Sequence, residues 1–341
     1  MPIDLRSDTV TKPTPAMRAV MFAAEVGDDH LDGDPTTRRL EARVAELLGK
    51  PAALFFPTGT MANLAAVTIH AAAGTEILVD SDAHVVNLTA AGIAALAGVQ
   101  PRFIHATGRT FDATDLARAM RAPSRYSPRA SLISVENTHN GAGGAITSLE
   151  SLREIAAVAR DRRIPLHLDG ARLWNVEAVT HVHIADYAAC AETVMVSFSK
   201  GLGAPVGAAL AGPVDLIDAA WTVRKRLGGG LRQSGIIAAG ALFGIEHNRA
   251  RLQEDHTNAA RLASALGSAG GARVVPPDTN IVMIDLPERT TAPDVARQVA
   301  NRGLLVSVWT PTRIRTVTHL DVSASEIDEA AAIIGDVLER G

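Results

Sequence analysis

The sequence predicts an α/β protein, in which a mainly parallel sheet is covered by helices on both faces and is followed by a smaller α+β domain. Short apolar runs rich in β-branched residues alternate with helical patterns from residue 54 to residue 211, as in βαβ units. The pattern changes beyond Gly267-Ser-Ala-Gly-Gly271, and 341 residues are enough for one large and one small domain. We therefore expect an N-terminal arm over 1–15, a large domain over 16–248 and a small domain over 249–341.

The first 35 residues contain many turn formers, which predicts an irregular arm that docks on another part of the molecule. A short helix is expected over 16–24. Four nearby carboxylates would suit a calcium loop, but the glycine and glutamate spacing of an EF-hand is missing, so no metal site is expected. These carboxylates belong to Asp28, Asp29, Asp32 and Asp34.

The first helix of the large domain is predicted from Leu40, Val44 and Leu48, which fall on one helical face. Thr36 or Thr37 is the expected N-cap of this helix. The helices that follow have Ala-rich or amphipathic patterns, and the helix that runs to residue 159 is expected to open with a capping box, Thr147-x-x-Glu150. Predicted helices then cover 58–70, 87–96, 113–120, 184–190, 214–226, 234–248 and 251–266. Predicted strands cover 54–56, 76–79, 102–104, 131–135, 165–168, 193–198 and 208–211.

The C-terminal part is predicted to contain strands over 273–275, 280–285, 305–309 and 314–317. Helices are expected over 291–301 and 325–338, the second opened by the capping box Ser323-x-x-Glu326. This mixture of strands and helices predicts an α+β domain of ordinary size.

Composition excludes several classes of protein. A formal net charge of −4 gives no electrostatic reason to expect nucleic acid as a partner. The longest apolar helical run, 236–245, is too short to span a bilayer, and the first residues lack the apolar core of a signal peptide. The single cysteine, Cys190, excludes an intramolecular disulfide and is expected to be a small buried filler. A cytoplasmic location is therefore expected.

Two charged residues follow neighbouring predicted strands. Lys200 follows the strand over 193–198, and Asp169 follows the strand over 165–168. They are separated by about one crossover, so both side chains are expected at the carboxyl edge of the sheet, where ligands bind. A desolvated lysine there can form a Schiff base with a carbonyl cofactor, and a carboxylate can keep a pyridine nitrogen protonated. The alternative role of Lys200 is that of an ordinary solvated lysine at a strand end. The alternative role of Asp169 is that of a helix N-cap.

Other polar residues are expected near the same edge. Arg172 is within reach of a ring oxygen or a substrate carboxylate. Thr58-Gly59-Thr60 opens a helix, whose free N–H groups would suit a phosphate. His84 would stack on a ring, although a lone histidine in a loop is more often a surface residue.

Two further arginines, Arg232 and Arg315, are candidates for a carboxylate clamp. Arg232 follows the triple glycine over 228–230, and Arg315 lies on a C-terminal strand. Either would equally serve as a structural ion pair, and spacing alone does not separate the two roles.

An ordered set of motifs spans the chain from end to end. It comprises 4–11, 26–29 with 33–36, 57–60, 136–140, 166–172, 199–207, 228–235, 251–256 and 317–323. In these segments the chain resembles the L-threonine aldolases of the threonine aldolase/β-eliminating lyase family, which are fold-type I enzymes dependent on pyridoxal 5'-phosphate (PLP). The resemblance implies a fold-type I PLP-dependent transferase-like fold, with a mainly parallel seven-stranded sheet sandwiched by helices and a smaller C-terminal α+β domain.

The resemblance also implies roles. Lys200 would be the Schiff-base lysine, and Asp169 the partner of the ring nitrogen. Arg232 would act near the phosphate or from a neighbouring subunit. The implied assembly is a homotetramer, a dimer of dimers with active sites at a subunit interface. The ring would stack on His84, the phosphate would lie at Thr58, Gly59 and Thr60, and the substrate carboxylate would bind Ser7, Arg172 and Arg315.

Three positions depart from the family pattern. Thr89 stands where a glutamate is expected, Tyr126 aligns with an imidazole near the substrate hydroxyl, and Leu31 replaces an aromatic residue. All three are expected near the pocket for the substrate side chain, so they bear on specificity.

The predicted reaction is cleavage of L-threonine, L-allo-threonine or a related β-hydroxy-α-amino acid to glycine and an aldehyde. Two alternatives remain open at this point. The first is a PLP-dependent β-eliminating lyase or amino-acid racemase, because retro-aldol cleavage needs a base at the β-hydroxyl. The second is a PLP-binding protein with little catalysis.

Overall fold

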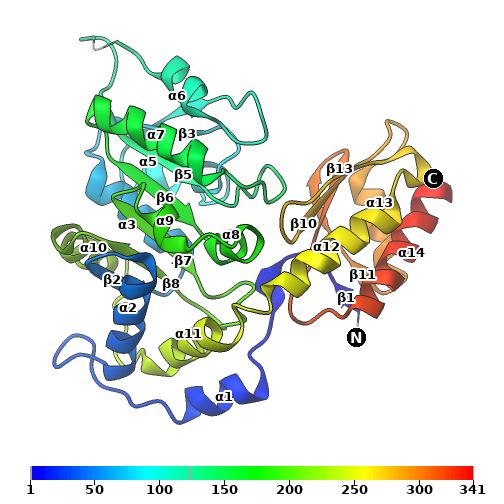
Figure 1. The fold of residues 1–341 in the computed structure, drawn as a ribbon, viewed down its shortest axis with the longest axis horizontal. Helices are drawn as coiled ribbons and strands as arrows, with labels where there is room; N and C mark the ends of the chain where they lie inside the picture. Colours follow the sequence, from blue (N-terminus) through cyan, green and yellow to red (C-terminus); the bar gives the residue numbers. More distant parts are fainter. Residues whose placement is uncertain (1, 123, 341) are drawn as a thin grey trace.

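The computed structural model describes residues 2–122 and 124–340. Figure 1 shows a large part, in which helices lie on both sides of a central sheet, and a smaller part that carries the C-terminus. Helix α12 (Leu252–Leu266) runs from the large part into the smaller one.

Seven strands form the central sheet. They are β2 (Ala52–Phe56), β3 (Glu76–Asp80), β4 (Gln100–Ile104), β5 (Ala130–Glu136), β6 (Leu166–Gly170), β7 (Thr193–Ser197) and β8 (Ala208–Gly212). Their order is β2-β8-β7-β6-β5-β3-β4. The two pairings of β8, with β2 and β7, are antiparallel, and all the others are parallel. The predicted fold class, a mainly parallel seven-stranded sheet between layers of helices, is confirmed.

Side chains alternate between the two faces of this sheet. Phe55 of β2 joins the core on one face, whereas Leu54 and Phe56 join the core on the other. The first face is covered by α2 (Pro35–Leu48), α6 (Ala113–Ala119), α7 (Leu149–Arg162), α8 (Leu173–Thr180), α9 (Ile184–Ala188) and α11 (Gly235–His247). The second face is covered by α3 (Gly59–His70), α4 (His84–Asn87), α5 (Gly92–Ala95) and α10 (Val214–Arg226).

The smaller part contains an antiparallel sheet in the order β12-β13-β10-β9. Its strands are β9 (Arg273–Val275), β10 (Ile281–Asp285), β12 (Ser307–Thr310) and β13 (Arg313–Val317). The core against this sheet comes from α12, α13 (Ala292–Ala300) and α14 (Ala324–Arg340), and a short 3-10 helix, η2 (Ala269–Gly271), precedes β9.

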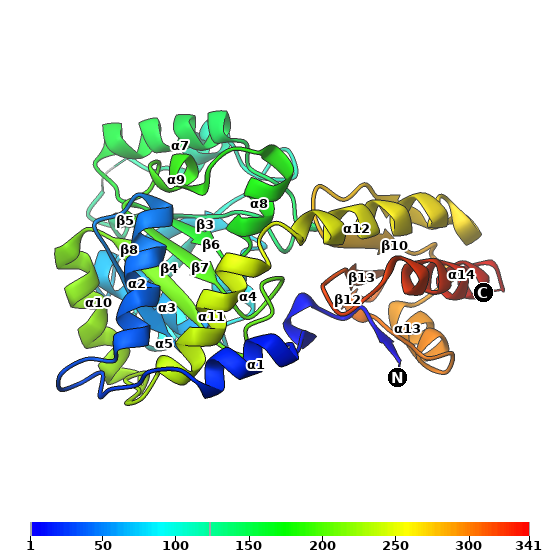
Figure 2. The ribbon, with the colours of Figure 1, turned by 60° about the horizontal axis from the view of Figure 1, so that its bottom comes forward.

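The N-terminal segment docks on the smaller part. Strand β1 (Ile3–Asp4) pairs in parallel with β11 (Leu304–Leu305), and Ile3 and Leu5 belong to the C-terminal core. A 3-10 helix, η1 (Asp8–Val10), then leads to α1 (Pro15–Phe22), which lies beside α11 (Figure 2). The chain therefore crosses from the smaller part to the large one within its first fifteen residues.

Two predicted caps are wrong by a few positions. Asp34, not Thr36 or Thr37, is the N-cap of α2, because Pro35 occupies the first helical position and Asp34 Oδ1 accepts the N–H of Thr37 at 2.8 Å. Likewise Ser148, not Thr147, caps α7. The capping box of α14 is present, with mutual hydrogen bonds between Ser323 and Glu326.

Two predicted elements differ from the structure, and one helix lies where none was predicted. The helix expected over 87–96 is two short helices, α4 and α5, because Ala90 and Ala91 adopt positive φ between them. The strand expected over 305–309 is divided between β11 and β12, and α8 was not predicted. Within the described ranges, no helix has both the length and the apolar character needed to cross a membrane.

Candidate active site

A cavity of about 280 Å³ opens at the carboxyl ends of β5, β6 and β7. Its wall is completed by the N-terminal segment and by β13 of the smaller part. Eight residues predicted from the sequence line it, and they come from six separate stretches of the chain. These are Ser7, Gly59, Thr60, His84, Asp169, Arg172, Lys200 and Arg315.

Lys200 lies in the cavity wall, three residues beyond β7. Burial, followed by the positive charge of Arg172, lowers the pKa of the Lys200 amine to about 8. Thr11 donates its hydroxyl to the carbonyl oxygen of Lys200 at 3.1 Å, which ties the N-terminal segment to this loop. A lowered pKa makes the neutral, nucleophilic amine available near neutral pH.

Asp169 is the fourth residue of β6 and is almost fully buried. Asn63 Nδ2 donates to its Oδ2 at 2.6 Å, and the backbone N–H of Ala171 donates to its Oδ1 at 3.1 Å. These two donors fix the plane of the carboxylate at the cavity wall. Asp169 is not a helix N-cap, because it is still within the strand.

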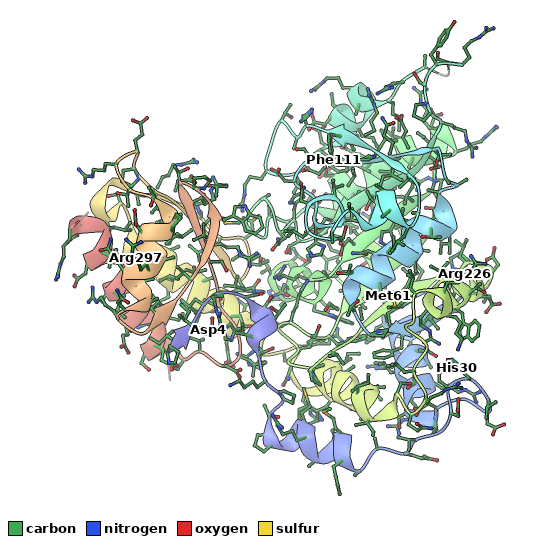
Figure 3. The ribbon with its side chains drawn as sticks, turned by 180° about the vertical axis from the view of Figure 1, so that it is seen from behind. Asp4, His30, Met61, Phe111, Arg226 and Arg297 are labelled. Atoms are coloured by element: carbon green, nitrogen blue, oxygen red, sulfur yellow. The ribbon has the colours of Figure 1, made fainter. Side chains whose placement is uncertain are left out.

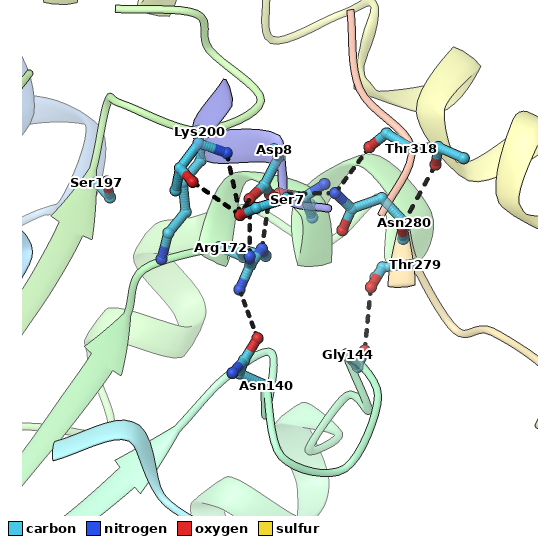
Figure 4. Close-up of polar contacts among 12 residues, drawn as sticks. Ser7, Asp8, Asn140, Gly144, Arg172, Ser197, Lys200, Thr279, Asn280 and Thr318 are labelled. Carbon is cyan, nitrogen blue, oxygen red and sulfur yellow. Dashed lines mark hydrogen bonds and ion pairs between the residues drawn. The ribbon is translucent and has the colours of Figure 1, made fainter. Parts of the chain in front are cut away.

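Arg172 is held by a carboxylate that sequence reasoning missed. Arg172 Nε donates to Asp8 Oδ2 at 2.7 Å, and Nη2 donates to Asp8 Oδ1 at 2.8 Å (Figure 4). Asn280 Nδ2 donates to Asp8 Oδ2 from the opposite side at 3.2 Å. Burial on its own would raise the pKa of Asp8, but Arg172 holds that pKa far below its usual range.

Arg315 has a different environment. Its Nη1 donates to Asn140 Oδ1 at 2.8 Å, and its Nη2 donates to the carbonyl oxygen of Arg6 at 3.1 Å. No carboxylate among the described residues forms an ion pair with Arg315, although only 9% of the residue is exposed. Burial, followed by the charge of Arg172, lowers the pKa of Arg315 to about 10, so the group remains protonated at neutral pH. A buried cation without an anionic partner at a cavity wall is suited to an anionic ligand.

The N-terminus of α3 forms another part of the wall. Thr58 is the N-cap, and its hydroxyl accepts the N–H of Met61 at 3.1 Å. Thr58 itself does not line the cavity, whereas Gly59 and Thr60 do. Their N–H groups have no hydrogen-bond partner in the part of the chain that is described, so they remain available to an anion.

His84 begins α4 and lines the cavity. Its backbone N–H donates to Glu136 Oε2 at 2.8 Å, and Glu136 Oε1 accepts the N–H of Asn140 at 2.9 Å. Glu136, at the end of β5, therefore fixes two loops at the cavity mouth.

Besides Thr58, four predicted site residues lie outside this cavity in the single chain. Arg232 is half exposed and forms an ion pair with Asp28 at 3.3 Å. Leu31 is 77% exposed, and Figure 3 shows its neighbour His30 at the edge of the large part. Their positions leave both residues free to contact another copy of the chain.

Thr89 and Tyr126 are also absent from the cavity wall. The hydroxyl of Thr89 donates to the carbonyl oxygen of Val85 at 2.7 Å, and the neighbouring Leu88 lines the cavity instead. Tyr126 is 89% exposed, in the loop between α6 and β5. Within one chain neither residue lines this cavity, and their role in the side-chain pocket stays a prediction.

Sequence reasoning missed several polar residues of the wall. Ser197 and Ser199 line the cavity beside Lys200, and the alternation Ser-Phe-Ser-Lys would have indicated that both share the side of the strand that Lys200 follows. Asn63, Glu136 and Asn140 also line it. Glu136 and Asn140 lie in the motif segment 136–140, from which no role was predicted for either side chain, and no local pattern distinguishes Asn63 from an ordinary polar residue.

Comparisons with known proteins agree with this geometry. A family model described as beta-eliminating lyase matches residues 4–289. Low specificity L-threonine aldolase of Escherichia coli (strain K12) is 41% identical over 331 residues, which cover 97% of each chain. Low-specificity L-threonine aldolase 1 of Arabidopsis thaliana is 40% identical over 333 residues, covering 95% of this chain and 93% of that protein.

Solved structures show the same fold. The threonine aldolase of Leishmania major has a TM-score of 0.81 at 19% identity, covering 99% of this chain and 100% of that chain. A high-resolution structure of SPT that holds PLP has a TM-score of 0.77 at 19% identity, covering 98% and 87%. The chain therefore belongs to the β-eliminating lyase family and is a relative of the low-specificity L-threonine aldolases, as its motifs predict.

Proposed function

We propose that this chain is a PLP-dependent aldolase that cleaves L-threonine, L-allo-threonine or a related β-hydroxy-α-amino acid to glycine and an aldehyde. The observation that carries the proposal is the cavity that combines the Lys200 amine, the Asp169 carboxylate and the Arg315 guanidinium. The family relationship to low-specificity L-threonine aldolases supports the choice of reaction.

The cavity wall suits PLP by the chemistry of its donors. Lys200, whose amine pKa is lowered to about 8, would hold the cofactor aldehyde as a Schiff base. Asp169 would accept a hydrogen bond from the ring nitrogen. The free N–H groups of Gly59 and Thr60 would bind the phosphate at the N-terminus of a twelve-residue helix.

PLP supplies an electron sink for the carbanion that remains on the glycine carbon when the Cα–Cβ bond breaks. Asp169 contributes by keeping a negative charge at the ring nitrogen, which favours the protonated ring. Its two donors, Asn63 and Ala171, hold the carboxylate in place without neutralising it.

The substrate carboxylate would bind Arg315, because that guanidinium has no anionic partner of its own in the described chain. Ser7 and Arg172 Nη1, which also donates to Asn140 Oδ1 at 3.4 Å, would complete the carboxylate site. Binding the carboxylate there orients the amino acid so that its α-amine faces Lys200.

Among the described residues, His84 supplies the one imidazole of the cavity wall. We assign it to pack against the cofactor ring and to accept the β-hydroxyl proton, directly or through a water molecule. Glu136 would keep His84 in position through the backbone hydrogen bond.

The enzyme is proposed to act as a homotetramer, a dimer of dimers with active sites at the subunit interface. Leu31 and Phe22, 77% and 94% exposed, support an interface near these residues. Arg232 would act near the phosphate of a neighbouring copy.

A three-part organisation, with an arm over 1–15 and domains over 16–248 and 249–341, is part of the same proposal. So is a cytoplasmic location, which the single cysteine supports.

Product analysis tests the reaction. The purified protein with PLP is incubated separately with L-threonine, L-allo-threonine, phenylserine and a β-substituted alanine. We expect glycine and an aldehyde from the hydroxy amino acids, and no turnover by the Lys200→Ala variant. Release of ammonia and a 2-oxo acid, or inversion at Cα without cleavage, would instead identify a β-eliminating lyase or a racemase. Bound PLP without turnover of any substrate would identify a weakly catalytic binding protein.

A further inference from the structure

A buried chain of hydrogen bonds leads away from the cavity behind Asp169. Asn63 Nδ2 donates to Asp169 Oδ2 at 2.6 Å, and Asn63 Oδ1 lies 3.0 Å from His167 Nε2. The other ring nitrogen, His167 Nδ1, lies 3.0 Å from Thr193 Oγ1. The same hydroxyl lies 2.9 Å from His70 Nε2. These hydrogen bonds thus join β6 and β7 to two residues of α3, Asn63 and the last residue, His70.

The direction of every bond follows from the carboxylate at its end. An ionised carboxylate only accepts, so Asn63 presents its NH₂ group to Asp169 and its carbonyl oxygen to His167. A carbonyl oxygen also only accepts, so His167 Nε2 must carry the hydrogen. Burial lowers the pKa of His167 to about 4, so the ring is neutral near pH 7 and Nδ1 has no hydrogen. Thr193 therefore donates to His167 Nδ1 and accepts from His70.

Neither His167 nor Thr193 lines the cavity, and both are at most 1% exposed. They cannot touch a ligand there. Their effect on the cavity passes through Asn63, which does line it. Because both ring nitrogens of His167 have fixed partners, the imidazole has one orientation, and the acceptor Asn63 Oδ1 sets the tautomer with the hydrogen on Nε2.

We propose that His167 is a positioning residue that holds Asn63 in the one amide orientation able to donate to Asp169, and so keeps Asp169 ionised against the ring nitrogen of PLP. This inference rests on the proposed function, which puts PLP in this cavity. If the Asn63 amide were reversed, two oxygens would face each other at 2.6 Å. That repulsion would favour a protonated Asp169, and the ring nitrogen would then lose its anionic partner.

The two roles that His167 could have predict different measurements. A purely structural histidine would change only the stability of the protein when replaced. A positioning histidine changes the protonation of the PLP ring nitrogen and kcat, while the KM for the amino acid stays nearly constant, because the carboxylate site at Arg315 is untouched.

The test compares two variants of the holoenzyme. His167→Leu removes both hydrogen bonds, whereas His167→Gln retains an N–H group near the position of Nε2 and can still donate to Asn63. The readouts are kcat and KM for L-threonine and the ¹⁵N chemical shift of the ring nitrogen in ¹⁵N-labelled PLP. We expect about a tenfold lower kcat and a shift towards unprotonated pyridine in His167→Leu, with most of the wild-type behaviour recovered in His167→Gln.

A His167→Leu enzyme with wild-type kcat and a protonated ring nitrogen, changed only in melting temperature, overturns the inference. Where His167→Leu does not fold, Thr193→Val removes the hydroxyl partner of His167 Nδ1, together with its contact to His70, and leaves the bond to Asn63 in place. A smaller change in the same direction is then expected. An unchanged ring nitrogen and kcat in Thr193→Val then overturn it. A wild-type protein that binds no PLP contradicts the proposed function instead, so the two failures are distinguishable.

Discussion

Arg172 and Asp8 form a bidentate ion pair, with N–O distances of 2.7 and 2.8 Å, although 164 residues separate them in the sequence. Both side chains are buried. The pair neutralises Arg172 and ties the N-terminal segment to the edge of the central sheet. Arg315 beside it has no such partner among the described residues. Of the two arginines, Arg172 is therefore held by a buried ion pair, and Arg315 is the cation that we propose an incoming carboxylate would neutralise.

The Asp8→Asn variant should unfold more easily. It leaves the buried Arg172 without an anion, and breaking one side of a buried ion pair typically costs about 3–5 kcal/mol. We expect a loss of about this size in the free energy of unfolding at pH 7, measured on the apoprotein by urea denaturation. Asp4→Asn is a matched control, because Asp4 pairs with the largely exposed Arg6 and its loss should cost much less.

The stabilisation from Asp8 should also depend on pH. The folded-state pKa of Asp8 lies far below its unfolded value, so the stabilisation is present above about pH 4 and is lost as the pH falls below it. The difference between wild type and Asp8→Asn should shrink on acidification. A difference that stays constant from pH 7 to pH 3 contradicts this assignment of the ion pair.

Lys200 should destabilise the apoprotein near neutral pH. Burial, then Arg172, lowers its pKa to about 8, so between pH 8 and about 10.5 the folded state binds fewer protons than the unfolded state. Stability from this group therefore rises with pH across that window, by up to about 3 kcal/mol. Lys200→Met should be more stable than wild type at pH 7, and the difference should vanish near pH 10.5. A Lys200→Met apoprotein less stable than wild type at pH 7 would show that burial of the charged Lys200 amine does not destabilise the folded state.

Arg315→Gln should weaken substrate binding more than it changes the chemical step. Loss of a charge-assisted carboxylate contact typically costs about 1.5–3 kcal/mol, so the KM for L-threonine should rise by about ten- to a hundredfold. The visible absorbance of bound PLP should be unchanged. Arg313→Gln is the control, because Arg313 lies on the same strand, pairs with Asp285 and does not line the cavity. An equal rise in KM in both variants would mean that the strand, and not the guanidinium of Arg315, is responsible.

Tyr126 should not be needed for catalysis. It is 89% exposed and lies outside the cavity wall, so Tyr126→Ala should leave kcat/KM for L-threonine within about twofold of wild type. A loss of tenfold or more would show that Tyr126 reaches the site of a neighbouring copy, and would restore the role that the sequence suggested.

The central sheet was predictable because short stretches of the sequence identify its strands. Runs such as 193–197 are apolar and β-branched, and the alternation with helices dictates a parallel sheet whose carboxyl edge holds Lys200 and Asp169. The exact caps were less predictable, since Asp34, Thr36 and Thr37 are all good N-cap residues. The position of Pro35 decided among them.

The supporting contacts of the site were not predictable from the sequence. Asp8 meets Arg172, and Asn63 meets Asp169, across 164 and 106 residues of chain. Such pairs depend on how the N-terminal segment and α3 pack on the sheet, and no periodicity records that packing. Two positive-φ residues, Ala90 and Ala91, divide the helix expected over 87–96, and Leu88 rather than Thr89 lines the cavity of the single chain. The role predicted for Thr89 stays a prediction.

The most direct test of the account asks which lysine holds PLP. The sequence has four lysines, Lys12, Lys50, Lys200 and Lys225. The protein is incubated with PLP, reduced with borohydride to make the link permanent, digested and mapped by mass spectrometry. We predict a single phosphopyridoxyl group, on the peptide that contains Lys200, and its loss when L-threonine is added before reduction. Stable labelling of Lys12, Lys50 or Lys225, with Lys200 unmodified, would contradict the assignment of this cavity as the active site.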